Sequence, residues 1–117
     1  MMKARRPQFG RWAAPCWLAL LLAGAASGAT AADRAAGKVQ AAACAVCHGP
    51  LGLSTLPNAP HLAGQPQIYL AEQLRNYRDG RRKHEIMSVI AKPLTDREID
   101  NLSAWYASLL IEVREPR

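Results

Sequence analysis

Cys44-Ala45-Val46-Cys47-His48 is the most informative segment of this sequence. Its two thiols lie one helical turn apart, so both can add to the vinyl groups of a single porphyrin. The histidine that follows directly is then carried beneath the ring, where it can bind the iron. This spacing predicts a c-type haem attached covalently through Cys44 and Cys47, with His48 as a ligand to the iron.

Two other kinds of site also use closely spaced cysteines. A thioredoxin-like redox dithiol needs a βαβ framework, and the sequence contains no segment of strand periodicity from which to build one. A structural zinc site needs a second ligand pair at close spacing, whereas His61 and His84 are far apart and match no zinc-finger pattern. The pentapeptide therefore favours a haem over a dithiol or a zinc ion.

The composition leaves room for one small domain. The chain has 117 residues, of which 50% are hydrophobic and 21% charged, and this excludes a multidomain enzyme and a disordered tail. Its net charge is +6, but Lys3, Arg5, Arg6 and Arg11 all precede the first acidic residue, Asp33. The basicity belongs mainly to the N-terminal segment, so nucleic acid is not an expected partner. With one Phe, three Trp and three Tyr, the core needs something else to fill it.

The N-terminal segment has the three parts of a secretory signal peptide. Residues 1–16 are basic and irregular, Trp17 to Ala23 is apolar, and small residues follow to Ala32. Cleavage is expected after Ala31, which makes 1–31 the signal peptide and 32–117 a monohaem domain in the periplasm.

An uncleaved membrane anchor is the alternative, because Trp12 to Ala32 contains no charge. If the signal is cleaved, Cys16 leaves with it and no stable membrane insertion is expected.

The mature segment reads as an all-α domain with long loops. A first helix is expected from Asp33 to Val46, and a second from Pro66, which is stopped by Gly80. A third begins at a capping box formed by Thr95 and Glu98. Glycine and proline mark residues 49–64 as a loop, and residues 81–94 are expected to form another.

From about Gly37 to Leu109 the chain resembles a small bacterial class I cytochrome c. The matching stretches are Ala43 to Pro50, Pro60 to Gln65, Tyr69-Leu70, Met87-Ser88, and Leu94-Thr95-Asp96 through Trp105-Tyr106-Ala107. The resemblance implies three main helices and long loops wrapped round one covalently bound haem, with the first and last helices crossing. It also implies that Gly37 and Ala41 let the first helix approach Trp105 and Tyr106.

The same resemblance assigns roles round the iron. It implies that the Pro60 carbonyl accepts a hydrogen bond from the free ring nitrogen of His48, and that Leu62 packs on the porphyrin. It further implies that Met87, the only methionine after Met1 and Met2, is the second axial ligand. His84 and His61 are the alternative ligands. His61 stands where the family usually has Asn, so the hydrogen bonding of that loop stays open.

With His48 and Met87 on either side, the iron has no open position, which favours electron transfer over catalysis. The expected function is therefore a one-electron carrier that is not itself an enzyme and that meets redox partner proteins. A haem-bearing subunit of a larger oxidoreductase is the alternative, and an enzyme or sensor with a labile sixth ligand is a third possibility.

Five basic residues from Arg75 to Lys83 stand against only two acidic residues between positions 75 and 85. This basic run is either a solvated surface at a helix end or a patch that steers an acidic redox partner.

Overall fold

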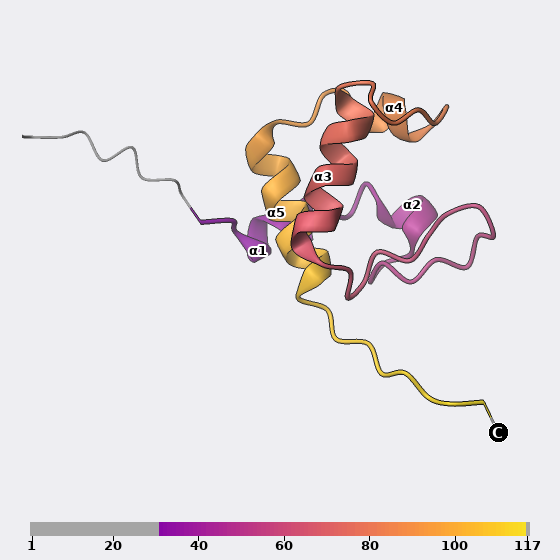
Figure 1. The fold of residues 1–117 in the computed structure, drawn as a ribbon. Coiled ribbons are helices and arrows are strands. Elements are labelled where there is room, and N and C mark those ends of the chain that lie inside the picture. Colours follow the sequence, from indigo (N-terminus) through magenta and orange to yellow (C-terminus); the bar gives the residue numbers. More distant parts are fainter. Residues whose placement is uncertain (1–30, 117) are drawn as a thin grey trace, which may run out of the picture.

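The computed structural model describes residues 31–116 and contains helices without strands in that range (Figure 1). No helix among these residues is long and apolar enough to cross a bilayer. The predicted signal peptide, residues 1–31, lies outside the described residues apart from Ala31. The helices are α1 (Arg34–Gln40), α2 (Ala45–His48), α3 (Gln67–Arg78), α4 (Met87–Ile90) and α5 (Asp96–Ala107).

The first expected helix is divided into two. The Asp33 carboxylate caps α1 by accepting hydrogen bonds from the backbone N–H groups of Ala35 and Ala36. After Gln40 the backbone N–H groups of Ala42 and Ala43 bond to carbonyls three residues back, and these tight turns separate α1 from α2. The expectation of one helix from 33 to 46 was wrong, because alanine-rich composition does not show where the backbone tightens.

The two longest helices begin close to the predicted positions, and α3 also ends where it was expected to end. Pro66 precedes the first residue of α3, and Gly80 follows its end with a φ of 79°, a conformation that favours glycine. The predicted capping box of α5 is confirmed: the Thr95 hydroxyl accepts from the Glu98 N–H, and the Glu98 carboxylate accepts from the Thr95 N–H.

The segment from 81 to 94 is not entirely loop. It contains α4, a single turn that begins at Met87 and ends at Ile90. The sequence gives little sign of this helix, because Ile86 at its start offers no capping side chain. Met87 is therefore held on a helical turn and not on an irregular loop.

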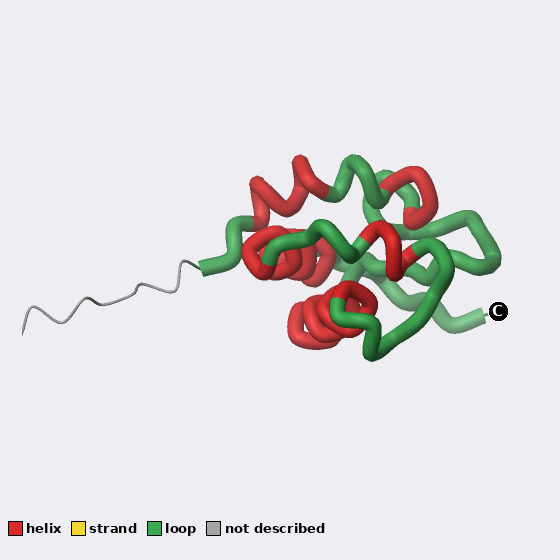
Figure 2. The backbone as a smooth tube through the Cα atoms, turned by 90° about the horizontal axis from the view of Figure 1, so that it is seen from above, coloured by secondary structure: helices red, strands yellow, loops and turns green. Residues whose placement is uncertain are grey.

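Helices α1, α3 and α5 build the core. The buried cluster consists of Ala41, Leu70, Leu102 and Tyr106. In α1, a Cβ on buried Gly37 would overlap the Asn101 carbonyl of α5 and lie 3.0 Å from the Trp105 Cβ. Glycine thus lets these two backbones come together, as the resemblance implied. Both views place α2 and α4 on the same side of the pair formed by α3 and α5 (Figures 1 and 2).

Candidate functional site

The short helix α2 presents two thiols and one imidazole. Cys44 and Cys47 are both half-buried and are not joined in a disulfide. His48 is buried, with 7% of its surface exposed, although it is a polar side chain at the end of a surface turn. A buried imidazole needs a partner for its ring nitrogens, and here one nitrogen has a partner in the next loop.

The His48 ring is oriented by the loop between α2 and α3. Its Nδ1 lies 2.8 Å from the carbonyl oxygen of Pro60, which can only accept, so Nδ1 carries the proton. The deprotonated Nε2 is then the nitrogen with a lone pair to offer a metal.

The same loop is tied back to α2 by Ser54. The Ser54 hydroxyl donates to the Cys47 carbonyl at 2.8 Å, and the Ser54 N–H donates to the Nδ1 of His61 at 2.9 Å. His61 is exposed and serves as an acceptor within the loop. The question that the sequence left open at position 61 is thereby answered: the imidazole closes the loop from within.

Met87 and Leu62 reach this side of the molecule from other elements. Met87 is the first residue of α4 and is half-buried. Leu62 is half-buried and packs against the core cluster, as does Cys44. The fold therefore brings α2, the loop that carries Pro60 and Leu62, and the turn that carries Met87 to one side of α3 and α5.

His84 has a different place from the one expected for a ligand. Its Nδ1 accepts hydrogen bonds from the backbone N–H groups of Ile86 and Met87, each at 3.3 Å. Because Nδ1 accepts, the neutral His84 ring carries its proton on Nε2, which is the opposite of the arrangement that leaves Nε2 of His48 free for a metal. From the sequence, His84 was either an alternative ligand or a solvated loop side chain, and this contact was missed.

The residues of this region fit a large apolar group held by thiols and an imidazole. Burial raises the pKa of the Cys44 thiol and also that of the neighbouring Tyr106 phenol, so both groups are uncharged. Large apolar side chains remain exposed on the two segments that flank the site, namely Leu51, Leu53, Leu56, Ile86, Val89 and Ile90. The buried cluster has only four residues, and a large apolar surface lies exposed beside it. This combination is expected where a large apolar group completes the core.

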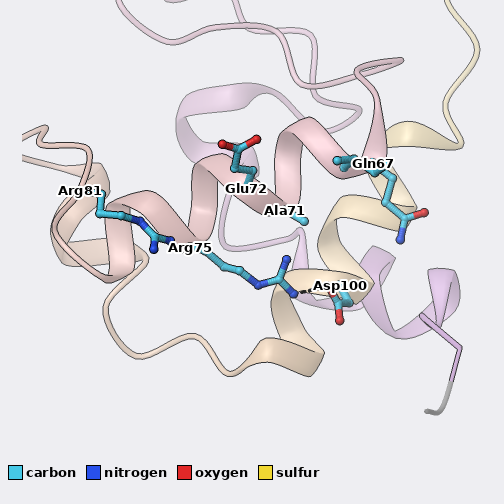
Figure 3. A pocket seen from close by; sticks show the side chains of 7 residues that line it. Gln67, Ala71, Glu72, Arg75, Arg81 and Asp100 are labelled. Atoms are coloured by element: carbon cyan, nitrogen blue, oxygen red, sulfur yellow. Dashed lines mark hydrogen bonds and ion pairs between the residues drawn. The ribbon is translucent and has the colours of Figure 1, made fainter.

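The basic run is partly engaged by acidic residues of α5. The Arg75 guanidinium donates to Asp100 at 2.7 Å, beside a pocket formed by α3, α5 and Arg81 (Figure 3). Arg78 bonds both Asp79 and Asp96, and these carboxylates raise its pKa. Arg75 and Arg78 therefore serve mainly to join α3 to α5.

The remaining three basic residues lie beyond α3 and are exposed. Arg81 bonds Asn76 and Asp79. Arg82 bonds Gln73 and stacks on Tyr77, with its guanidinium carbon 4.7 Å from the ring centroid. We call Arg81, Arg82 and Lys83 the basic patch.

A strandless domain with two thiols and an imidazole on one turn defines a class, the small helical proteins with covalently attached haem. The family model for cytochrome c matches residues 34–109, and the chain belongs to the cytochrome c family. The predicted class I fold and the covalently bound haem c are thereby confirmed.

Relatives of two lengths match the chain. The thiosulfate dehydrogenase electron acceptor of Thiomonas intermedia is 43% identical over 94 residues, which are 79% of this chain and 43% of that protein. Cytochrome c-554(548) of Halomonas halodenitrificans is 38% identical over 81 residues, which are 67% of this chain and 98% of that protein. The chain thus spans less than half of some curated relatives, cytochrome c4 proteins among them, and nearly all of another.

A solved structure shares the fold. The crystal structure of reduced recombinant cytochrome c4 from Pseudomonas stutzeri matches with a TM-score of 0.65 and 35% identity. The match covers 68% of this chain and 47% of that one.

Proposed function

We propose that this protein is a one-electron carrier of the periplasm that passes electrons between redox proteins. The observation that carries the proposal is the His48 imidazole, whose Nδ1 is bound to the Pro60 carbonyl beside two unbridged thiols. This arrangement commits one ring nitrogen to the protein and leaves the other for iron. When bound, haem c supplies the one-electron chemistry of its iron.

Each residue of the site has a role in holding that group. Cys44 and Cys47 would hold the haem through two thioether bonds, and His48 would bind its iron through Nε2. Pro60 fixes the plane of the His48 ring and increases the electron density on Nε2 through the 2.8 Å hydrogen bond. Leu62 packs against the core cluster, and its apolar side chain would contact the haem and exclude water from it.

Met87 would be the second protein ligand of the iron. Its support is the position of α4 on the same side as α2 (Figure 1), together with the hydrogen bonds that His84 Nδ1 accepts, which leave the proton of that ring on Nε2. Met87 is also the only methionine in the described segment. Two protein ligands leave no coordination position for peroxide or oxygen, so the protein transfers electrons and is not itself an enzyme.

An absorption spectrum of the full-length protein from the periplasm, oxidised and reduced, tests the proposal. We expect sharp bands of a low-spin c-type haem on reduction, a sulfur-to-iron charge-transfer band on oxidation, and pigment that survives acid-acetone extraction. The variant with both Cys44→Ala and Cys47→Ala is the control and should keep no pigment after extraction. Pigment that leaves the wild-type chain on extraction would overturn covalent attachment.

N-terminal sequencing of the same preparation tests the signal peptide. A mature chain that begins at Ala32 supports cleavage after Ala31. A chain that keeps residues 1–31 and remains with the membrane fraction supports the anchor alternative.

A second candidate is a haem-bearing subunit of a larger oxidoreductase. The name of the Thiomonas relative, a thiosulfate dehydrogenase electron acceptor, favours a dehydrogenase as electron donor. Co-purification of the untreated protein distinguishes the two: a freely diffusing carrier elutes alone, whereas a subunit elutes with a stoichiometric partner. In both cases we propose that the basic patch meets an acidic surface on the partner.

A further inference from the structure

We propose that His84 is a positioning residue for Met87, which it holds by capping the start of α4. The inference rests on the proposed role of Met87 as an axial ligand. It concerns a residue that sequence patterns place only among the alternative ligands.

A helix as short as α4 cannot hold its own shape in isolation. Helix formation needs a costly first turn, and the first N–H groups of any helix lack partners within it. Ile86, at the start of α4, has no side chain that can accept those hydrogen bonds. The acceptor for these N–H groups must therefore be a residue outside Met87–Ile90.

His84 provides that acceptor. Its Nδ1 receives the N–H groups of Ile86 and Met87, each at 3.3 Å, which is the pattern of an Asn or Asp cap. The His84 N–H also donates to the Ser88 hydroxyl, and the Ser88 N–H donates to the His84 carbonyl, both at 3.0 Å. Four hydrogen bonds therefore connect this one residue to the first turn of α4.

The His84 ring is in turn fixed against α3. It meets the Tyr77 ring edge to face, with centroids 6.4 Å apart and planes inclined at 74°. His84 thus links a long helix that belongs to the core with the turn that carries Met87. Because the Met87 N–H is itself one of the bonded groups, loss of the imidazole releases the backbone of the proposed ligand directly.

A ligand that is less firmly held is more easily displaced. We therefore expect His84→Ala to keep Met87 as the ligand at rest, with the charge-transfer band present, but to let an added ligand replace it more readily. His84 is exposed, so water partly compensates for the lost acceptor. The expected change is that of a missing helix cap, about fivefold in the equilibrium.

The test titrates oxidised full-length haem protein with imidazole while the sulfur-to-iron band is followed. His84→Ala should bind imidazole about fivefold more tightly than wild type, as expected for a lost cap. His84→Asn, whose side-chain oxygen can accept the same two N–H groups, should return to the wild-type affinity. Glu85→Gln, at the neighbouring exposed residue, is the matched control and should also behave as wild type.

The outcomes separate the two proposals. Absence of the band in untreated wild type overturns Met87 as a ligand, and this inference falls with it. If the band is present, equal imidazole affinity in wild type and His84→Ala overturns the positioning role alone. Tight binding in His84→Asn as well as in His84→Ala also overturns it, because the acceptor would then not be what matters.

Discussion

At the scale of single residues, the two proposed iron ligands, His48 and Met87, are held in different ways. The His48 ring is fixed by a 2.8 Å hydrogen bond to Pro60 in a loop that is itself tied to Cys47 through Ser54. Met87 has no comparable bond from its side chain and depends on the placement of its backbone. Variation in the behaviour of this haem should therefore arise more from the methionine side than from the histidine side.

Substitution of Met87 tests the ligand assignment directly. Met87→Ala should abolish the sulfur-to-iron band and lower the reduction potential, because a thioether favours ferrous iron. Glu85→Gln, at an exposed polar residue just before the same turn, is the matched control and should leave both nearly unchanged. Spectra and a potentiometric titration check the prediction, and a band that persists in Met87→Ala would contradict it.

Residues were predictable where their chemistry is local. The Cys44 to His48 pentapeptide identifies the haem by spacing alone, and Thr95 with Glu98 identifies a helix start. The role of His84 could not be predicted, because histidine is not a usual capping residue and its contact depends on where Tyr77 lies. The acceptor at His61 was hidden for the same reason, since Ser54 reaches it only after the loop has closed.

At the scale of helices, prediction followed the strength of the end signals. Helices α3 and α5 have proline, glycine or a capping box at their ends and were found in the sequence. Helices α2 and α4 each span four residues and have no capping side chain of their own at the first position. Their positions are set by tertiary contacts, which periodicity in the sequence does not contain.

The crossing of α1 and α5 depends on the absence of a side chain at Gly37. Gly37→Ala should force the helices apart, because the new methyl group overlaps the Asn101 backbone. Overpacking of this kind costs about 1–3 kcal/mol. Thermal unfolding of the haem protein checks this, with Val39→Ala on the exposed side of α1 as control. An unchanged midpoint in Gly37→Ala would show that the crossing is not tight.

The α5 capping box predicts a pH dependence. Hydrogen bonds from the Thr95 backbone and hydroxyl lower the pKa of Glu98, so the folded protein holds this carboxylate charged more readily than the unfolded chain does. The stabilisation is complete above the unfolded pKa of about 4.3 and is lost as the pH falls through the lowered folded value.

Glu98→Gln should therefore flatten the loss of stability in acid. Part of that loss should remain, because Arg78 and Arg75 also lower the pKa of Asp96. Urea unfolding midpoints measured from neutral to acid pH provide the check. Equal slopes in wild type and Glu98→Gln would exclude a contribution from the cap.

Over the protein as a whole, the five basic residues from Arg75 to Lys83 divide into two groups. Arg75 and Arg78 are paired with Asp96, Asp100 and Asp79, so they contribute little to the long-range field. The basic patch formed by Arg81, Arg82 and Lys83 projects beyond α3 and is exposed. Of the five basic residues from Arg75 to Lys83, these three are the more exposed and the better suited to steering a partner.

Charge reversal of the basic patch tests that role. Changing Arg81, Arg82 and Lys83 together to Glu should slow electron transfer to an acidic partner and leave the potential nearly unchanged, since exposed charges act weakly through water. The wild-type rate should fall as salt shortens the Debye length from about 30 Å at 0.01 M to about 10 Å at 0.1 M. Stopped-flow measurements at several ionic strengths check this prediction. A rate that changes with neither salt nor the substitutions would show that the basic patch is only a solvated surface.

The bond between the Asp33 N–H and the Asn101 side-chain oxygen, 2.7 Å long, joins residues 68 positions apart. Together with Gly37 against α5, it makes the beginning of the domain depend on its last helix. Closing so long a loop costs entropy before any packing repays it, so we expect slower folding than in helical proteins whose contacts are between sequence neighbours. A chain emerging N-terminus first cannot complete α1 packing until α5 has been delivered. We therefore expect the thiols of Cys44 and Cys47 to be accessible for haem attachment before α1 and α5 pack together.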